Sequence, residues 1–296
     1  MYPKKLKRKL KLRHNLKHMS IILSTLFRVK NFTIGASIFG LIIVFSIGGS
    51  IFIKHDSLKQ YFSAAQPPSL AHPLGTDGLG KDVFAQLCLG IQQSLLIGFL
   101  VATITTPIGL FIGFIAGYYR GVVDAILRTL TDVFLMLPSL PILILISSLV
   151  KKGLDVVLMA LIISIFYWAW FARSVRSEIL SLKERDFIYI AKLSGMNSIE
   201  ILFGELMPHL LQWIGARYVH TILSAIMTEV GLEILGLGPQ NTVTIGNILF
   251  WAINYGAVFR GLWWWWAPPV ITLISLFIAL FYINLGLSEV ALVRKK

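Results

Sequence analysis

Six long runs of apolar residues with almost no charge constrain the fold of this chain more than any other feature. An α-helix needs about 20 apolar residues to cross the hydrocarbon core of a bilayer. Runs of about this length lie at 32–53, 94–117, 133–150, 156–172, 210–234 and 261–288. Of the 296 residues, 56% are apolar and only 14% are charged, a composition that excludes a soluble globular protein. The sequence therefore predicts an all-α, polytopic membrane protein with six transmembrane helices.

The run at 210–234 differs from the others because Arg217 and Glu229 interrupt it. We expect these two residues near opposite ends of one helix, close to the membrane surfaces. The runs otherwise hold essentially no ionisable group and no pair of carboxylates at depth. Ion-coupled and proton-coupled transporters need such groups, so that mechanism is not expected. In the last run, Pro268-Pro269 predicts the start of the membrane helix.

The distribution of Lys and Arg predicts the orientation, because positive residues favour the cytoplasmic side. Ten of the 27 lie in residues 1–30, which hold no Asp or Glu, so this tail accounts for most of the net charge of +13. With both termini in the cytoplasm, cytoplasmic segments hold 20 Lys and Arg, and outer segments hold six. The tail is therefore interpreted as an orientation signal next to membrane lipid, and nucleic acid is not an expected partner.

This layout divides the chain into five segments. We expect a basic cytoplasmic tail (1–31), a first transmembrane helix (32–53), an extracytoplasmic loop (54–93), a transmembrane core (94–290) with a long cytoplasmic loop (173–209), and a cytoplasmic C-terminus (291–296).

Residues 75–81 match the first seven positions of the phosphate-binding pattern G-x-x-x-x-G-K-[ST], in which backbone amides hold phosphates. The eighth position is Asp82, which lacks the hydroxyl group that binds magnesium and repels phosphate. Asp77 adds a second negative charge, and His72-Pro73 stands where a strand should precede the loop. We therefore interpret the segment as a glycine-rich turn and not as a nucleotide site.

The sequence contains no constellation for catalysis. The six His residues are scattered, and Cys88 is the single cysteine, which excludes an internal disulfide and a cysteine-based metal cluster. No Ser or Cys has an adjacent base. We expect neither an enzyme nor a protein with its own metal or cofactor.

The cytoplasmic loop predicts a pair of helices. Residues 178–194 are helix formers with apolar residues near one face, and Gly195 is a suitable left-handed stop. Asn197 is expected to cap a second helix together with Glu200, and Pro208 is expected to end it. On composition alone, the loop could also be a linker at the lipid surface.

Three motifs in order resemble one family. Residues 170–187, continuing to Ala191, Gly195 and Pro208, resemble the signature loop of permease subunits in binding-protein-dependent ABC importers. Residues 72–83 with Gly90 and Ser94, and then residues 229–238, are similar to the second permease of the dipeptide, oligopeptide and nickel group. The resemblance covers roughly residues 32–290.

The resemblance implies a type I ABC importer permease fold and a set of partners. These are a second homologous permease, two ATP-binding subunits that bind ATP and magnesium, and an extracytoplasmic solute-binding protein. The helix pair would insert into the ATPase subunits. Tyr189 replaces the Glu of the family consensus. The coupling residues implied are Asp186, Ala191, Gly195, Met196, Asn197, Ile201 and Pro208.

The expected function is a permease of an ATP-driven importer of oligopeptides or oligosaccharides in the inner or plasma membrane; nickel also stays open. The alternative is a stand-alone secondary transporter or channel. Trp263–Trp266 form an unbroken run that predicts an aromatic belt at the membrane interface or a stacking surface for a sugar. Expected residues of the substrate pathway are Glu229, Trp263 and Trp264.

Overall fold

The computed structural model describes residues 26–52, 62–119, 121–150, 154–239 and 242–293. Most of the expected basic tail, the start of the outer loop and the last three residues of the chain lie outside the described residues. Within the described ranges every extended regular element is a helix, and the only β-type pairings are two isolated bridges. The all-α prediction is therefore confirmed.

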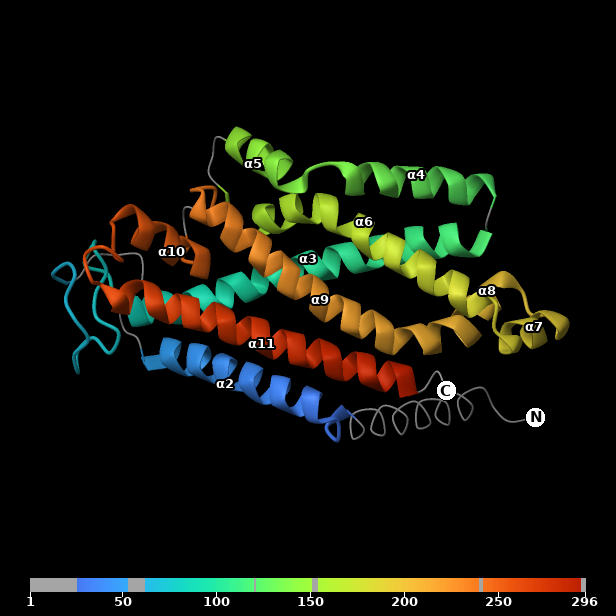
Figure 1. Ribbon diagram of the computed structural model, residues 1–296, viewed down its shortest axis with the longest axis horizontal. Helices are drawn as coiled ribbons and strands as arrows, with labels where there is room; N and C mark the ends of the chain where they lie inside the picture. Colours follow the sequence, from blue (N-terminus) through green and yellow to red (C-terminus); the bar gives the residue numbers. More distant parts are fainter. Residues whose placement is uncertain (1–25, 53–61, 120, 151–153, 240–241, 294–296) are drawn as a thin grey trace, which may run out of the picture.

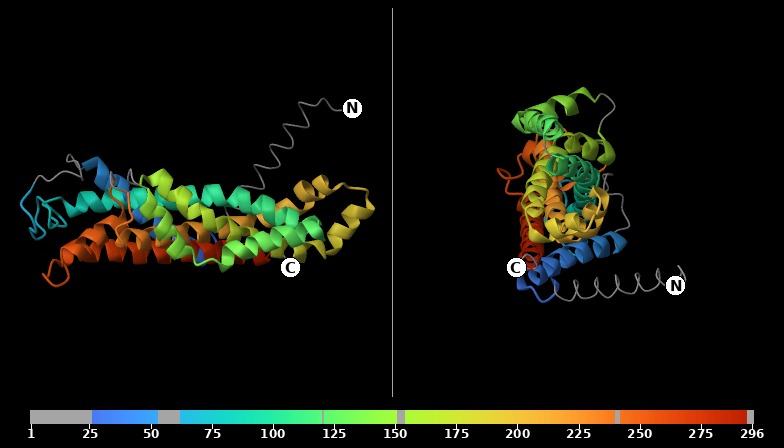
Figure 2. Two further views of the ribbon diagram at one scale, coloured as in Figure 1. Left: turned by 90° about the horizontal axis from the view of Figure 1, so that it is seen from above. Right: turned by 90° about the vertical axis from the view of Figure 1, so that its right-hand side faces the viewer.

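The helices form one elongated bundle (Figure 1). In chain order they are α2 (Lys30–Phe52), α3 (Val83–Tyr119), α4 (Val122–Met136), α5 (Ser139–Leu149), α6 (Val156–Lys183), α7 (Asp186–Leu193), α8 (Ser198–Glu200), the π-helical turn η1 (Ile201–Leu206), α9 (Met207–Ile234), α10 (Ile245–Asn254) and α11 (Trp263–Val293). The loop at 62–82 lies at one end of the bundle, and α7 with α8 lies at the other (Figure 2).

Four of these helices are long and apolar enough to cross a membrane, namely α2, α3, α6 and α11. The pair α4 and α5 would be a fifth span if counted together, although the two are bent by 77°. By length and composition α9 is not among them; it carries Arg217, Glu229 and Glu233. The structure thus supports a multi-pass membrane protein with four or five spans, and six spans stay a prediction.

The expected continuous helix at 133–150 is wrong, because the chain breaks between α4 and α5. Leu137 has ψ of 135° and Pro138 has ψ of 94°, so both are extended. Proline lacks a backbone N–H and disfavours the helical conformation in the residue before it. Pro138 therefore separates two helices.

Helix α11 also departs from the prediction, since it begins at Trp263 and contains both Pro268 and Pro269. The prolines lie in its second turn, where few hydrogen bonds are lost, and they do not set its start. Helix α3 spans 37 residues, about 55 Å at about 1.5 Å per residue, so it extends well beyond the expected run.

Glycines bring α3 and α6 into close contact. Gly109, Gly113 and Gly117 occur every fourth residue and therefore share one face of α3. A Cβ atom on Gly113 would lie 2.4 Å from the carbonyl oxygen of Ala172 in α6. Small residues at this spacing allow helix backbones to approach closely in a membrane. Close packing matters there because lipid tails are as apolar as the side chains, so apolar burial alone drives little helix association. The two long helices thus form the central pair of the bundle.

Buried side chains form three clusters along the bundle. The cluster nearest the 62–82 loop joins α3, α9, α10 and α11 around Trp265, and the middle cluster joins α3, α5, α6 and α9. The third lies at the opposite end and joins α6, α7, η1 and α9. Each end of the bundle therefore has its own packed core, and these two ends carry the polar motifs of the sequence.

Candidate functional site

The helix pair at the end opposite the 62–82 loop is a tightly capped hairpin. Gly195 has φ of +78°, the left-handed conformation that ends α7, as predicted. The backbone N–H of Met196 donates to the carbonyl oxygen of Ala191 at 3.2 Å, and that of Gly195 donates to Lys192 at 3.0 Å. This pair of bonds is a Schellman motif, so three of the predicted coupling residues form a single turn.

The second helix of the hairpin begins as the sequence predicts. The Asn197 side chain accepts a hydrogen bond from the N–H of Glu200 at 2.9 Å, and the Glu200 carboxylate accepts one from the N–H of Asn197 at 2.8 Å. This is a capping box, which satisfies two backbone donors that a helix start otherwise leaves free. The capping prediction is confirmed.

The expected end of that helix at Pro208 is wrong. The chain passes from α8 through η1 into α9, with Pro208 at the start of α9. A proline cannot donate to the carbonyl group four residues earlier, and the wider π turn just before it accommodates the missing bond. The hairpin is therefore continuous with a long helix of the bundle.

Part of the predicted coupling set is buried inside the hairpin. Ile201 is 1% exposed and packs with Ala191, Ile188 and Leu206 against the C-terminal part of α6. Asp186 and Asn197 are exposed, and Met196 is half-buried. Ala191 and Ile201 therefore hold the shape of the hairpin, while the polar residues lie on its surface.

The outer surface of α7 carries an apolar patch that the sequence did not single out. We define the α7 patch as Tyr189, Ile190 and Leu193, all strongly exposed, with Leu193 88% exposed. The helical pattern predicts one apolar face that includes Ile190 and Leu193, but not which of its residues are covered. An exposed contiguous apolar patch is typical of a protein contact surface.

Ion pairs tie the α6 extension to its neighbours. Arg176 donates two hydrogen bonds to the carboxylate of Asp124 in α4, at 2.5 and 2.7 Å. Arg173 pairs with Asp132 in the same helix. Lys183 donates to the carbonyl oxygen of Tyr118 at the end of α3. Bidentate pairs of this kind fix geometry as well as adding energy, so α6 continues rigidly out to the hairpin.

The opposite end is capped by the glycine-rich turn. The carboxylate of Asp77 accepts hydrogen bonds from the backbone N–H groups of Leu79 and Lys81, both at 2.8 Å, and from the Gln86 side chain at 2.8 Å. Asp77 is buried, and its own carboxylate fills the position that a phosphate group would need. The interpretation as a structural turn is confirmed.

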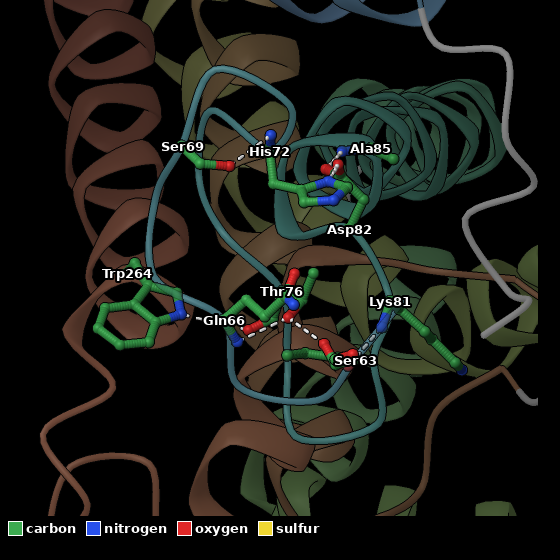
Figure 3. Close-up of polar contacts among 10 residues, drawn as sticks. Ser63, Gln66, Ser69, His72, Thr76, Lys81, Asp82, Ala85 and Trp264 are labelled. Carbon is green, nitrogen blue, oxygen red and sulfur yellow. Dashed lines mark hydrogen bonds and ion pairs between the residues drawn. The ribbon is translucent and has the colours of Figure 1, made fainter. Parts of the chain in front are cut away.

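Further polar contacts lock the same loop (Figure 3). His72 Nδ1 and a carboxylate oxygen of Asp82 lie 3.0 Å apart, and the other oxygen of Asp82 accepts from the N–H of Ala85 at 3.0 Å. The Thr76 hydroxyl group donates to Ser63 and accepts from the N–H of Gln66. Asp82 therefore stands at the start of α3. In the phosphate-binding pattern this position holds the hydroxyl group that binds magnesium.

The four tryptophans do not form one surface. Trp263 is exposed, the indole N–H of Trp264 donates to the carbonyl oxygen of Thr76 at 3.2 Å, and Trp265 is fully buried. A Cβ atom on Gly78 would lie 2.8 Å from the Trp265 ring. At least two of the four rings thus hold the 62–82 loop onto α11.

Two carboxylates lie buried together near the end of α9, where the sequence predicts no carboxylate pair at depth. Glu229 accepts from the Ser94 hydroxyl group at 2.9 Å, and Glu233, one turn later, accepts from that of Thr244. Ser94 also accepts from the N–H of Ile245, the first residue of α10. The sequence prediction left out Glu233, although its spacing of four residues from Glu229 places both carboxylates on one face of α9.

These structural features define the class of protein to which the chain belongs. Apolar helices of membrane-spanning length, a packed loop at one end and a helical hairpin at the other describe a multi-pass membrane protein. Among the described residues, no group of three His, Cys, Asp or Glu could hold a metal ion.

Comparison with known proteins identifies the family. Residues 109–288 match the family model described as "Binding-protein-dependent transport system inner membrane component", and the chain belongs to this family. The oligopeptide transport system permease protein OppC of Mycobacterium tuberculosis is 34% identical over 197 residues, which cover 66% of this chain and 67% of that protein. OppC of Lactococcus lactis subsp. cremoris is 29% identical over 98% of both chains.

The dipeptide transport system permease protein DppC of Bacillus subtilis is also similar, with 33% identity over 71% of this chain and 66% of that protein. The chain is therefore a permease of binding-protein-dependent ABC importers of the peptide group, located in the cell membrane. It is a transport component and not an enzyme. The resemblance inferred from the three motifs is confirmed.

Proposed function

We propose that this chain is a six-span permease that forms half of the translocation pathway of an ATP-driven peptide importer. It would act with a second permease, two ATPase subunits that bind ATP and magnesium, and an extracytoplasmic solute-binding protein. Both termini would lie in the cytoplasm. The observation that carries the proposal is the hairpin, whose exposed α7 patch is joined rigidly to two long helices of a chain in this family.

The connections of the hairpin support a coupling role. Only two residues separate the end of α6 at Lys183 from the start of α7 at Asp186, and the far side of the hairpin runs through η1 into α9. The buried cluster around Ile201 joins all of these elements. A displacement of the hairpin by the ATPase subunits would therefore move α6 and α9 together. Such differential contacts can shift a permease between inward-open and outward-open states.

The structure divides the coupling residues into two roles under this proposal. The α7 patch would contact the ATPase subunits, with Asp186 and Asn197 at its polar edge. Ala191, Gly195, Met196 and Ile201 would maintain the turn, and Pro208 would set the π turn that leads into α9. Tyr189 stands where the family consensus has Glu. At this position it would offer the ATPase subunits an apolar contact in place of a charged one.

The packing of α9 supports its assignment as a membrane span. It contacts α3 and α11, which both have membrane-spanning length and composition, and it runs beside them in the bundle (Figure 1). Its carboxylates at Glu229 and Glu233 are buried and hydrogen-bonded to hydroxyl groups. Burial against protein removes the exposure to lipid that would make such residues costly.

Peptides are the substrate class that we propose, because the similar permeases are named for oligopeptide and dipeptide transport. A sugar pathway on the tryptophan run is less favoured, since Trp265 is buried and the N–H of Trp264 is bonded to Thr76. Trp263 and Glu229 remain proposed contributors near the outer end of the pathway.

The decisive experiment compares Leu193→Asp with Ser181→Asp in the complete importer. Both positions are exposed, and both variants add one negative charge at the same end of the bundle, but only Leu193 lies in the α7 patch. We expect Leu193→Asp to reduce peptide uptake at least about tenfold, the effect of about 1.4 kcal/mol of lost contact energy, and to abolish stimulation of ATP hydrolysis by the loaded binding protein.

Ser181→Asp should keep uptake within about twofold of the parent, corresponding to less than about 0.5 kcal/mol. Membrane insertion of both variants is measured by their amounts in washed membranes. Normal uptake by a correctly inserted Leu193→Asp variant would contradict the proposed contact.

A further inference from the structure

One face of α9 carries polar residues that other described helices cover only in part. Arg217, His220 and Ser224 follow one another at helical spacing, and Arg217 and His220 are exposed. The Arg217 guanidinium group lies over the Trp213 ring at 5.4 Å, but the imidazole of His220 forms no hydrogen bond with another described residue. His220 lies near the middle of α9, which the proposed function places in the membrane, where contact of a polar side chain with lipid is costly.

The break between α4 and α5 lies close to the same face. Leu137 and Pro138 are not helical, and the first residues of α5 have no side-chain cap. Irregular backbone at membrane depth is tolerated only where protein buries it or where it lines a water-filled cavity. Two separate features, the exposed His220 and the interrupted helix pair, therefore require polar surroundings here.

Both features meet at one cavity of about 170 Å³, far larger than the roughly 10–15 Å³ that one water molecule requires. Its wall is formed by residues from α5, α6 and α9: Ser139, Phe166, Tyr167, Trp170, His220, Thr221 and Ser224. The wall holds hydroxyl groups, one imidazole and three aromatic rings, and none of these residues is Asp, Glu, Lys or Arg. This lining combines hydrogen-bonding groups with apolar faces and has no fixed charge.

The wall is held in place by Tyr167. Its hydroxyl group lies 2.8 Å from the carbonyl oxygen of Ser224 and 2.7 Å from the Thr228 hydroxyl group, which joins α6 to α9. Trp170, one turn further along α6, is 62% exposed and lies at the open side of the cavity. The aromatic surface is therefore positioned by contacts within the chain and does not depend on an occupant.

We propose that this cavity, here called the α5–α6–α9 cavity, contacts the peptide during its passage through the membrane. The proposal rests on the proposed function. His220, Ser139 and Ser224 offer hydrogen bonds to peptide amide groups, while Trp170 and Phe166 offer faces to apolar side chains. A lining without fixed charge suits a carrier of peptides with varied side chains, because no charged side chain is repelled or trapped.

Cysteine labelling tests whether the cavity is wet and occupied by substrate. Ser224→Cys places a thiol in the cavity wall, and Ser275→Cys places one on α11 among the exposed apolar residues Ile271, Ile274 and Phe277. The native Cys88 is buried and serves as the background. The complete importer in proteoliposomes is treated with a charged methanethiosulfonate reagent, with and without a saturating transported pentapeptide and ATP.

We expect the reagent to label Ser224→Cys, the peptide to slow that labelling at least fivefold, and Ser275→Cys to stay at the background rate. Labelling of Ser224→Cys at the background rate would show that lipid or the second permease covers the cavity, and would overturn the proposal. Rapid labelling that the peptide does not slow would also overturn it, since the cavity would then hold water but not substrate.

A second measurement uses His220 itself. His220→Leu should raise the KM for peptide uptake about tenfold, because it removes the hydrogen-bonding group, and His220→Gln should restore most of the loss. Equal uptake by all three proteins would contradict a contact at His220. Uptake by the parent importer is measured in the same vesicles. If the parent importer takes up no peptide, the proposed function is contradicted. If uptake is normal but the peptide does not slow labelling of Ser224→Cys, only the assignment of the cavity is contradicted.

Discussion

At the scale of single residues, the buried carboxylates show how polar groups are retained inside this chain. Asp77 is buried, yet three donors surround its two oxygens. Glu229 and Glu233 each accept from a hydroxyl group on another helix or loop. Hydrogen bonds to another segment offset part of the cost of burying a carboxylate, so each of these side chains joins two segments of the chain.

The first prediction concerns Asp77. Asp77→Ala removes one acceptor group from three donors, and leaving buried donors unpaired costs about 1–3 kcal/mol for each group. We expect a clearly lower melting temperature of the detergent-purified protein and faster proteolysis in the loop at 62–82. Lys81→Ala is the matched control, because the hydrogen bonds between Lys81 and Asp77 use only backbone groups of Lys81, which the substitution keeps. An equal loss of stability in both variants would contradict the role of the Asp77 carboxylate.

At the scale of elements, two helix contacts decide the architecture: the glycine face of α3 and the core of the hairpin. Gly109, Gly113 and Gly117 meet α6 where a Cβ atom would collide with backbone or side-chain atoms. The hairpin instead depends on apolar burial around Ile201. Substitutions should therefore disrupt the two contacts in different ways. A larger side chain would overpack the first contact, and a charged side chain would be buried without a partner in the second.

Gly113→Val tests the first contact. The added side chain would meet the Ala172 carbonyl oxygen and Val175, and overpacking of this kind costs about 1–3 kcal/mol or more. We expect a lower melting temperature in detergent. Gly40→Val in α2 is the control, because a Cβ atom there meets nothing within 4 Å, and its effect should stay within about 0.5 kcal/mol. Similar melting temperatures for the two variants would contradict the close packing of α3 and α6.

Ile201→Asp tests the second contact. A charge in place of a side chain that is 1% exposed has no partner and should loosen α7 from η1. We expect faster amide hydrogen exchange across residues 186–206, while Leu193→Asp leaves exchange unchanged. Slow exchange in Ile201→Asp would show that this cluster does not hold the hairpin together. The comparison separates residues that maintain the hairpin from those proposed to contact a partner.

At the scale of the whole molecule, the proposed function makes the chain one subunit of a transport complex. In the phosphate-like turn, two backbone N–H groups already donate to the Asp77 carboxylate. We predict that the purified chain alone in liposomes takes up no radiolabelled pentapeptide. Uptake should appear only when the second permease, the ATPase subunits, the binding protein and ATP are present. Uptake by the chain alone would favour the alternative of a stand-alone transporter or channel.

Much of this protein follows from local sequence patterns. Apolar runs predicted the all-helical membrane fold, because a bilayer leaves few other ways to satisfy the backbone. Gly195, Asn197 and Glu200 predicted their turn and cap, because those contacts involve residues within a few positions of one another. The three motifs, taken in order, identified the family before any comparison.

The tertiary structure decided what depends on contacts between distant segments. The sequence could not show that Ile201 is buried while Leu193 is exposed, since both are apolar residues of the same loop. It also could not show that Glu229 and Glu233 face the protein interior, or that Ser139 and His220 line one cavity. Local patterns set helices and caps through short-range hydrogen bonds, whereas burial and cavities arise only when several helices pack together.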